Sequence, residues 1–207
     1  MTCVKIKVQP RIRAIFMTLM TVKDLNQIQT LFSEAGLDYK IELEDGIISV
    51  MGLSDIVSSE IGSILIRLLG NWVYPRRLGR VFDSAGGFIM PNTNVKAPDV
   101  SFVRAARLRQ SPRYFGELVP DLVVEIKSQS DRIKSIETKV LKLIELGAVV
   151  GIAIDPDEET VTIYRSTGEP IILANGDILT VAELFPGWEL PVSELCPPIF
   201  TEEETQS

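Results

Sequence analysis

Three charged residues, Asp99, Glu125 and Lys127, have the types and spacing to act together on a substrate. Glu125 and Lys127 lie in DLVVEIK, an apolar segment typical of a β-strand. Side chains alternate along a strand at about 3.3 Å per residue, so these two share a face and are about 7 Å apart. Leu122, Val124 and Ile126 point to the other face. A first Pro-Asp pair, Pro98-Asp99, lies at the start of a second predicted strand in KAPDVSFV. Asp99 precedes Glu125 by 26 residues. If the two strands are neighbours, Asp99 and Glu125 converge.

Two converging carboxylates repel each other unless a cation lies between them. Mg²⁺ suits this place because it takes oxygen ligands, keeps several waters and commonly uses one or two carboxylates plus substrate phosphate. The second Pro-Asp pair provides Asp121, which lies on the same strand and face as Glu125 but about 13 Å away, too far to share one ion. An acidic-x-Lys triplet alone is unspecific, because Asp38-Tyr39-Lys40 and Glu137-Thr138-Lys139 match as well.

The composition limits which side chains are available for catalysis or metal binding. The chain has 207 residues, 45% hydrophobic and 24% charged, which is typical of a globular protein with one domain. It has no histidine, and its two cysteines, Cys3 and Cys196, lie near opposite ends. Structural zinc sites and serine-histidine or cysteine-histidine triads are therefore excluded. Acid-base or metal chemistry must use carboxylates, lysines and water.

The termini and the longest apolar runs bear on location. No stretch of about 18 apolar residues is free of charge, so we expect no membrane-spanning segment. The first 22 residues place four basic residues before a short apolar run, but no small-x-small cleavage site follows. We therefore expect a cytoplasmic protein.

Charge is distributed unevenly. The net charge is -7, yet residues 156–207 hold 11 acidic residues and one basic residue, whereas residues 1–155 hold 20 basic and 17 acidic residues. Phosphate binding depends on Lys and Arg, so the net charge of +3 over residues 1–155 permits a nucleic-acid partner. Two sections are strongly basic, with Arg67, Arg76, Arg77 and Arg80 in one and Arg104, Arg107, Arg109 and Arg113 in the other. Solvated faces and loops would have the same composition.

The periodicity of the apolar residues predicts the elements that position these groups. Helical spacing occurs over residues 24–35, 55–73 and 132–147, the second helix beginning at a Ser54 or Asp55 cap and the third ending at Gly147. Asp45-Gly46 in YKIELEDGIISVM is a strong hairpin signal. Residues 78–103 fit a meander of short strands. Further strands are predicted at 121–127, 148–155, 159–166 and 169–175, the last two as a hairpin.

This order predicts an α/β fold in which a mixed sheet is flanked by helices, with a strand-helix-strand crossover after Glu125. An N-terminal helix and hairpin precede the sheet. We expect an N-terminal extension over residues 1–23, one domain over residues 24–194, and an acidic C-terminal tail over residues 195–207.

Pro-Asp followed by Glu-x-Lys on a strand resembles the PD-(D/E)XK phosphodiesterase superfamily, whose core is a mixed sheet flanked by helices, that is, a restriction-endonuclease-like fold. The chain resembles one branch more closely, the restriction endonucleases of the Uma-two type. The matching text covers roughly residues 22–195: YKIELEDGIISVM, SSEIGSILIRLL, LGRVF, KAPDVSFV, PDLVVEIKSQSD, the lysine of ETKVLKLIELG, VVGIAIDP, VTIYR and LFPGWELPVSEL. Each motif is weak, but their order and spacing together are specific.

The resemblance implies an Mg²⁺-dependent endonuclease, with Mn²⁺ as a substitute, that hydrolyses DNA phosphodiester bonds through a metal-activated water. Asp99, Glu125 and the main-chain carbonyl of Ile126 would then be metal ligands. Lys127 would orient the attacking water and offset transition-state charge, and Glu60, on the long helix, would hold a metal-bound water. One departure is Leu143, four residues after Lys139, where the closer branch commonly has tyrosine. A second is Val150, Gly151 and Ile152, in a strand where that branch often has Tyr and Trp.

Other interpretations stay open. The domain could be a catalytically silent binding or scaffold protein that retains the fold. The polar face with Asp121, Glu125 and Lys127 could merely meet water, and Glu60 could be a solvated helix position. A glycosidase using Glu60 and Glu125 is a weaker alternative, because 7% aromatic residues offer little to line a sugar cleft. The sequence leaves open DNA versus RNA, strandedness, specificity and oligomeric state; symmetric duplex cleavage would require a homodimer.

Overall fold

Two sheets organise the computed structural model, which describes residues 19–37 and 39–199. The larger sheet has the strand order β10-β9-β8-β7-β6-β3, and the smaller has the order β2-β1-β5-β4. A two-stranded sheet of β11 (Ile178–Leu179) and β12 (Leu190–Pro191) and a short 3-10 helix (Val192–Leu195) follow near the C-terminus. Cys3, most of the predicted extension over residues 1–23 and the end of the acidic tail lie outside the described residues.

The three predicted helices are present, and local signals explain their ends. α1 (Val22–Glu34) begins at a Thr21 capping box, in which the Thr21 and Asp24 side chains bond to each other's backbone amides. α2 (Ile56–Val73) is capped by Asp55, whose Oδ1 accepts from the Ser58 amide at 2.9 Å. α3 (Ile133–Glu145) ends before Gly147, whose φ of +120° suits a residue without a Cβ.

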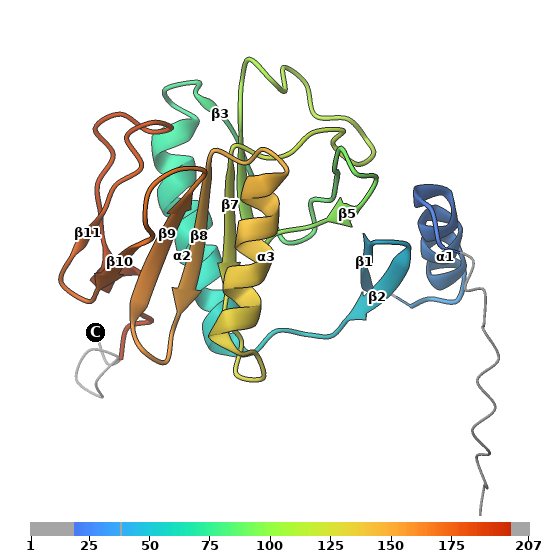
Figure 1. Ribbon diagram of the computed structural model, residues 1–207, viewed down its shortest axis with the longest axis horizontal. Coiled ribbons are helices and arrows are strands. Elements are labelled where there is room, and N and C mark those ends of the chain that lie inside the picture. The colour runs from blue at the N-terminus through green and yellow to red at the C-terminus, as the bar shows by residue number, and fades with distance from the viewer. Residues whose placement is uncertain (1–18, 38, 200–207) are drawn as a thin grey trace, which may run out of the picture.

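The predicted N-terminal hairpin is present as β1 (Lys40–Glu44) and β2 (Ile47–Met51), which pair antiparallel. Asp45 and Gly46 between them have φ values of +50° and +77°, as a two-residue turn with two left-handed positions requires. In Figure 1 the hairpin and α1 lie to one side of the larger sheet. The hairpin therefore lies beside the larger sheet rather than within it.

A strand-helix-strand crossover forms the centre of the larger sheet. β7 (Leu122–Ile126) runs into α3 and then into β8 (Val150–Asp155), which lies parallel to β7. β9 (Thr160–Arg165) and β10 (Ile171–Ala174) continue antiparallel as the predicted hairpin. The mixed sheet flanked by helices is confirmed.

The helices α2 and α3 cover opposite faces of the larger sheet (Figure 1). Leu122, Val124 and Ile126 belong to the core that packs against α2, and Val123 belongs to the core against α3. At Gly151 a Cβ would lie 2.3 Å from Cγ1 of Val140, so glycine allows α3 to approach β8 closely. The face that carries Glu125 is thus covered by α3, and the interpretation of this face as one that merely meets water is wrong.

The predicted meander over residues 78–103 is wrong as a single unit. β3 (Gly79–Asp83) and β6 (Val100–Arg104) pair with each other in the larger sheet. β4 (Phe88–Ile89) and β5 (Val95–Lys96), which lie between them in sequence, join the hairpin sheet instead. Short strands carry too little periodicity to indicate which sheet they join. The chain therefore connects the two sheets just before Asp99.

α2 is long and apolar enough to cross a membrane by length and composition alone. Its apolar face, including Ile61, Leu65 and Leu69, packs on the sheet in the main core. Core helices satisfy the same length and composition test.

Candidate functional site

Asp99 and Glu125 face each other across neighbouring strands. β6 and β7 pair antiparallel with Val100 opposite Val124, and one further step in this register places Asp99 opposite Glu125. Residues directly opposite in such a pair have their Cβ atoms about 4.5–5.5 Å apart on one face. The Asp99 Oδ2 atom also accepts a hydrogen bond from the Ile126 amide at 2.9 Å. The predicted convergence of these two carboxylates is therefore present in the register.

Both carboxylates are largely, but not fully, buried. Burial raises the pKa of Asp99 above its usual value, although its bond to the Ile126 amide opposes the shift. Burial and the nearby charge of Asp99 raise the pKa of Glu125 to about 8, against an ordinary 4.5. Lys139 offsets this only in part, with Nζ 3.9 Å from the Glu125 Oε2 atom. The pair thus lacks full charge compensation from the protein.

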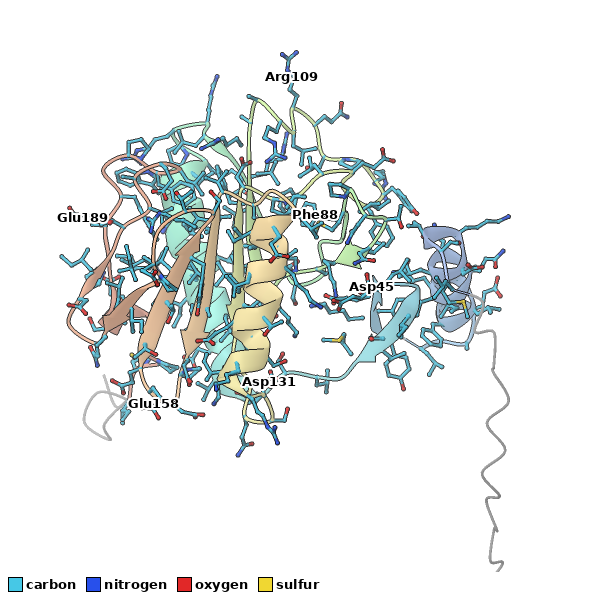
Figure 2. The ribbon with its side chains drawn as sticks, viewed as in Figure 1. Asp45, Phe88, Arg109, Asp131, Glu158 and Glu189 are labelled. Atoms are coloured by element: carbon cyan, nitrogen blue, oxygen red, sulfur yellow. The ribbon has the colours of Figure 1, made fainter. Side chains whose placement is uncertain are left out.

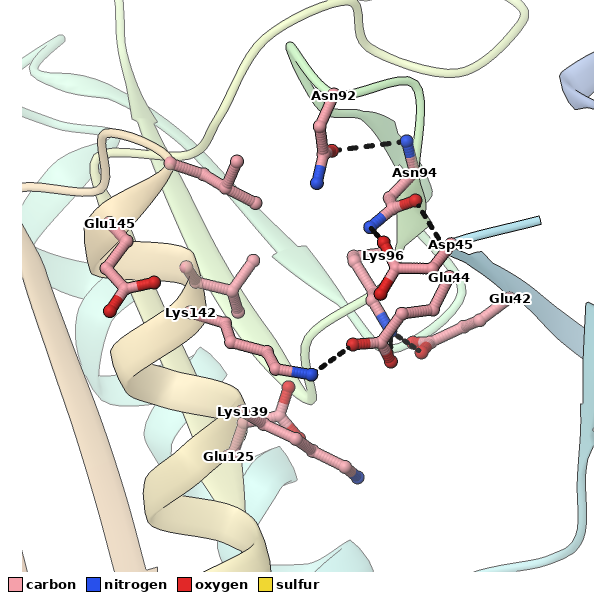
Figure 3. Close-up of a pocket in the computed structure, with 12 residues that line it drawn as sticks. Glu42, Glu44, Asp45, Asn92, Asn94, Lys96, Glu125, Lys139, Lys142 and Glu145 are labelled. Carbon is pink, nitrogen blue, oxygen red and sulfur yellow. Dashed lines mark hydrogen bonds and ion pairs between the residues drawn. The ribbon is translucent and has the colours of Figure 1, made fainter. Parts of the chain in front are cut away.

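Glu125 lies at the base of a pocket between α3 and the hairpin sheet, shown in Figure 3, with a cavity of about 210 Å³. Charged side chains of opposite sign line it. Lys96 contacts Glu42 at 3.3 Å and Glu44 at 2.7 Å, and Lys142 contacts Glu44 at 2.6 Å. These two lysines lower the pKa of Glu44 to about 2. The carboxylates of the hairpin are therefore paired, whereas Glu125 is nearly unpaired.

The hairpin is tied to the strand segment that delivers Asp99. The Glu42 Oε1 atom accepts from the Ala97 amide at 3.1 Å, and Lys40 Nζ donates to the Ala97 carbonyl at 2.7 Å. Lys40 and Glu42 also act electrostatically on both Asp99 and Glu125. The hairpin thus fixes the approach to Asp99 and adds charge of both signs to the site.

Lys127 is not directed at the carboxylate pair in this structure. It follows β7, and its amide donates to the Ile154 carbonyl at 2.9 Å, which extends the ladder with β8. Its amine is 3.6 Å from Asp155 Oδ1 and is hydrogen-bonded to Asp157. The structure therefore separates the three predicted residues. Asp99 and Glu125 face each other, whereas Lys127 pairs with Asp155 and Asp157.

The remaining predicted groups lie apart from the pair. Glu60 is partly exposed on α2, does not line the pocket, and within residues 19–37 and 39–199 forms no side-chain hydrogen bond or ion pair. α2 packs on the opposite face of β7, where a Cβ on Gly62 would lie 3.5 Å from Ile126 Cδ1. Glu60 and Glu125 therefore do not share this pocket, as a glycosidase would need. Ile126 contacts Asp99 through its amide; the use of its carbonyl as a ligand stays a prediction.

Asp121 has a structural role at the other end of β7. Its side chain is 1% exposed and accepts from the Arg104 amide at 2.9 Å. Arg107 and Arg104 lie 3.0 and 3.6 Å from its Oδ1 atom. Asp121 is thus paired and hydrogen-bonded, as a buried charge must be.

The donor set at Asp99 and Glu125 fits a hard divalent cation. Two carboxylates face one another across neighbouring strands beside a pocket that Glu125 lines, and Mg²⁺ commonly needs no more than one or two such ligands beside water. Within the described part of the chain, no group of three or more Asp, Glu, Cys or His side chains forms a preformed metal site. The fit therefore rests on the two opposed carboxylates and leaves the other positions to water and substrate.

Sequence reasoning missed the charged residues that the hairpin sheet and α3 bring to the pocket, namely Glu42, Glu44, Lys96 and Lys142. A signal was present in YKIELE, where Lys40, Glu42 and Glu44 alternate with the buried Ile41 and Leu43. Alternation indicates a polar face but does not tell what that face opposes.

Comparisons with known proteins bear on the family and the fold of the chain. The model of the Uma2 family, described as "Putative restriction endonuclease", matches residues 23–193. A solved structure titled as a putative nuclease belonging to DUF820 from Anabaena variabilis is similar with a TM-score of 0.68 at 22% identity, over 80% of this chain and 96% of that one. None of the curated proteins matches the chain. The structural likeness shows the fold, and the family match covers most of the sequence, so the chain belongs to the Uma2 family of putative restriction endonucleases.

Proposed function

We propose that this protein is a divalent-metal-dependent endonuclease that hydrolyses phosphodiester bonds of DNA. The observation that carries the proposal is the cross-strand pair of Asp99 and Glu125, which lacks a full complement of positive charge and of which Glu125 lines a pocket. Membership of a family described as "Putative restriction endonuclease" and the fold shared with a structure titled as a putative nuclease both support a nuclease function.

The protein's own groups would divide the work as follows. Asp99 and Glu125 would hold Mg²⁺ or Mn²⁺, which when bound lowers the pKa of a water and polarises the phosphoryl group. The Ile126 amide orients the Asp99 carboxylate through its 2.9 Å hydrogen bond. Burial by α3 keeps the surroundings poor in water, where fixed charges act most strongly.

Lysines provide the positive charge that a phosphoryl-transfer site requires. Lys139 lies nearest to Glu125, and a cation at the acid pair would free it for a substrate oxygen. Lys127 would reach the reacting phosphate only by leaving Asp155 and Asp157, since both lie on the far side of β7 from β6. We expect this exchange when substrate phosphate enters the pocket.

The test is cleavage of supercoiled plasmid and of a labelled duplex with Mg²⁺ or Mn²⁺. Asp99→Asn and Glu125→Gln should each reduce cleavage about 1,000-fold or more, equal to about 4 kcal/mol of transition-state stabilisation. Glu158→Gln, an exposed carboxylate after β8, is the matched control and should cleave like the wild type. Cleavage that survives both site substitutions, or that needs no divalent cation, contradicts the proposal.

A catalytically silent binding or scaffold domain is the second candidate, and the position of Lys127 favours it. An amine held by Asp155 and Asp157 cannot act at the carboxylate pair as the structure stands. Mn²⁺ titration by calorimetry separates the two functions, because a ligand of the native state must also raise the melting temperature. Mn²⁺ that neither binds nor stabilises, together with an absence of cleavage, supports the scaffold.

A further inference from the structure

Two arginine-rich segments that are distant in sequence form one surface at the end of the larger sheet. YPRRLGR (74–80) and RAARLRQSPR (104–113) contain seven arginines and no acidic residue. They lie together because β3 and β6 pair from Gly79 opposite Arg104 onward, and because the Ala105 amide donates to the Leu78 carbonyl at 2.9 Å. We call Arg76, Arg77, Arg80, Arg104, Arg107 and Arg109 the arginine surface.

Hydrogen bonds to neutral carbonyls hold part of this surface in place. Arg80 Nε donates to the Leu108 carbonyl at 3.2 Å, and its NH2 group donates to the Arg109 carbonyl at 2.8 Å. Arg76 stacks over the Trp72 ring with its guanidinium carbon 3.4 Å from the ring centroid. These contacts position the arginines but leave their charge uncompensated.

Few acids oppose the positive charge. Asp121, which is buried, forms ion pairs with Arg104 and Arg107. Glu183 lies near Arg104 but forms its ion pair with Arg165 at 2.5 Å. Within residues 19–37 and 39–199, the side chains of Arg76, Arg77, Arg80 and Arg109 form no ion pair. The surface is therefore strongly positive in a chain whose net charge is -7.

We propose that the arginine surface binds the phosphate backbone of a nucleic-acid duplex as an anchoring site separate from the carboxylate pocket. Arginine suits this task because its planar guanidinium matches phosphate geometry and is always charged. Such backbone contacts carry no sequence information but fix the position of the duplex. The proposal rests on the proposed nuclease function for its substrate but not for its measurement, which needs no cleavage.

The position of the surface predicts the extent of the bound duplex. Asp99, which immediately precedes β6, and Arg104, which ends it, are five residues apart, which is about 17 Å at 3.4 Å per residue. A B-form duplex rises 3.4 Å per base pair, so the anchor would lie about five base pairs from the reacting phosphate. Figure 2 shows Arg109 projecting from the end of the molecule opposite to Asp131, which follows β7. The acid pair and the anchor can thus contact points about half a helical turn apart on one duplex.

The experiment measures binding of a fluorescein-labelled 20-base-pair duplex by anisotropy in EDTA, over a series of salt concentrations. The variant is Arg77→Gln/Arg109→Gln, because both side chains are exposed and make no hydrogen bond or ion pair in the described part of the chain. Loss of two phosphate contacts should weaken binding about tenfold at moderate salt and reduce the slope of log K against log salt by about 2.

Lys23→Gln/Arg132→Gln is the control, since it removes the same charge from two exposed positions elsewhere. It should leave the salt slope near that of the wild type, and thermal melting checks that both variants are folded. Equal weakening by the two variants, or no duplex binding by the wild type, overturns the proposal. Preference for phosphatidylserine vesicles over duplex, with the same arginine dependence, would assign the surface to a membrane and would also overturn it.

Binding and cleavage fail independently. Duplex binding that depends on the arginine surface in a protein without cleavage would leave the anchor standing and remove the proposed enzyme. Metal-dependent cleavage in a protein whose Arg77→Gln/Arg109→Gln variant binds like the control would do the reverse.

Discussion

Asp121, which immediately precedes β7, and Glu125 share one face and are four residues apart, yet they lie at opposite ends of the strand. Asp121 is 1% exposed and meets two guanidinium groups and a backbone amide. Glu125 is 12% exposed and meets Lys139 at 3.9 Å and an opposing carboxylate. The same chemical group is neutralised at one end of β7 and left in electrostatic conflict at the other.

The difference separates a structural charge from a functional one. A buried carboxylate that has partners stabilises the fold, and its removal leaves those partners unsatisfied. A buried carboxylate without enough partners costs stability, and a protein keeps such a group where a ligand relieves the conflict. Burial alone does not distinguish the two cases, whereas the set of partners does.

The largest effect on stability should come from Asp121→Asn. The substitution removes the charge that holds Arg104 and Arg107 and weakens the bond to the Arg104 amide, so we expect a loss of about 3 kcal/mol. Urea denaturation at pH 8 measures it, with Glu125→Gln as the matched variant on the same strand. Glu125→Gln should be at least as stable as the wild type. Equal losses in both variants would break the comparison.

The pH dependence of stability should come from Glu125. Its pKa of about 8 in the folded state lies above the ordinary 4.5, so between these values the folded protein keeps a proton that the unfolded chain has released. Stability should therefore fall by a few kcal/mol as pH rises from about 5 to 8, and then level off.

Urea denaturation at a series of pH values tests this dependence. Glu125→Gln should flatten the fall between pH 5 and 8, whereas Glu158→Gln, an exposed control, should retain it. Wild-type and Glu125→Gln curves that stay parallel would show that Glu125 is ionised in the folded protein without cost.

The smallest effect should come from Lys142→Ala, which removes the ion pair between α3 and Glu44 of the hairpin. Lys142 is 54% exposed, and such pairs contribute about 0.5 kcal/mol because water screens them. Lys134→Ala, exposed on the same helix, is the control in denaturant unfolding. A loss above 2 kcal/mol would mean that the charges around the pocket contribute as much to stability as Asp121 does at the other end of β7.

Much of the fold could be predicted because its signals are local. Asp45-Gly46 indicates its turn by left-handed backbone preference, and Asp55 and Gly147 mark helix ends through hydrogen bonding and a missing Cβ. The crossover around Glu125 follows from a strand and a helix of unambiguous period. The two-residue strands at Phe88 and Val95 could not be assigned to a sheet, because two residues define no period.

The sequence by itself determined which groups are available, namely carboxylates and amines without histidine, and which of them share a face of β7. Only the tertiary structure decided their partners. The register of β6 against β7 places Asp99 opposite Glu125, and the pairing of β7 with β8 brings Lys127 to Asp155. The pairing of β3 with β6 brings the two arginine-rich segments together. The physical reason is that alternation along a strand is a local property, whereas the charge opposite each side chain depends on segments distant in the chain.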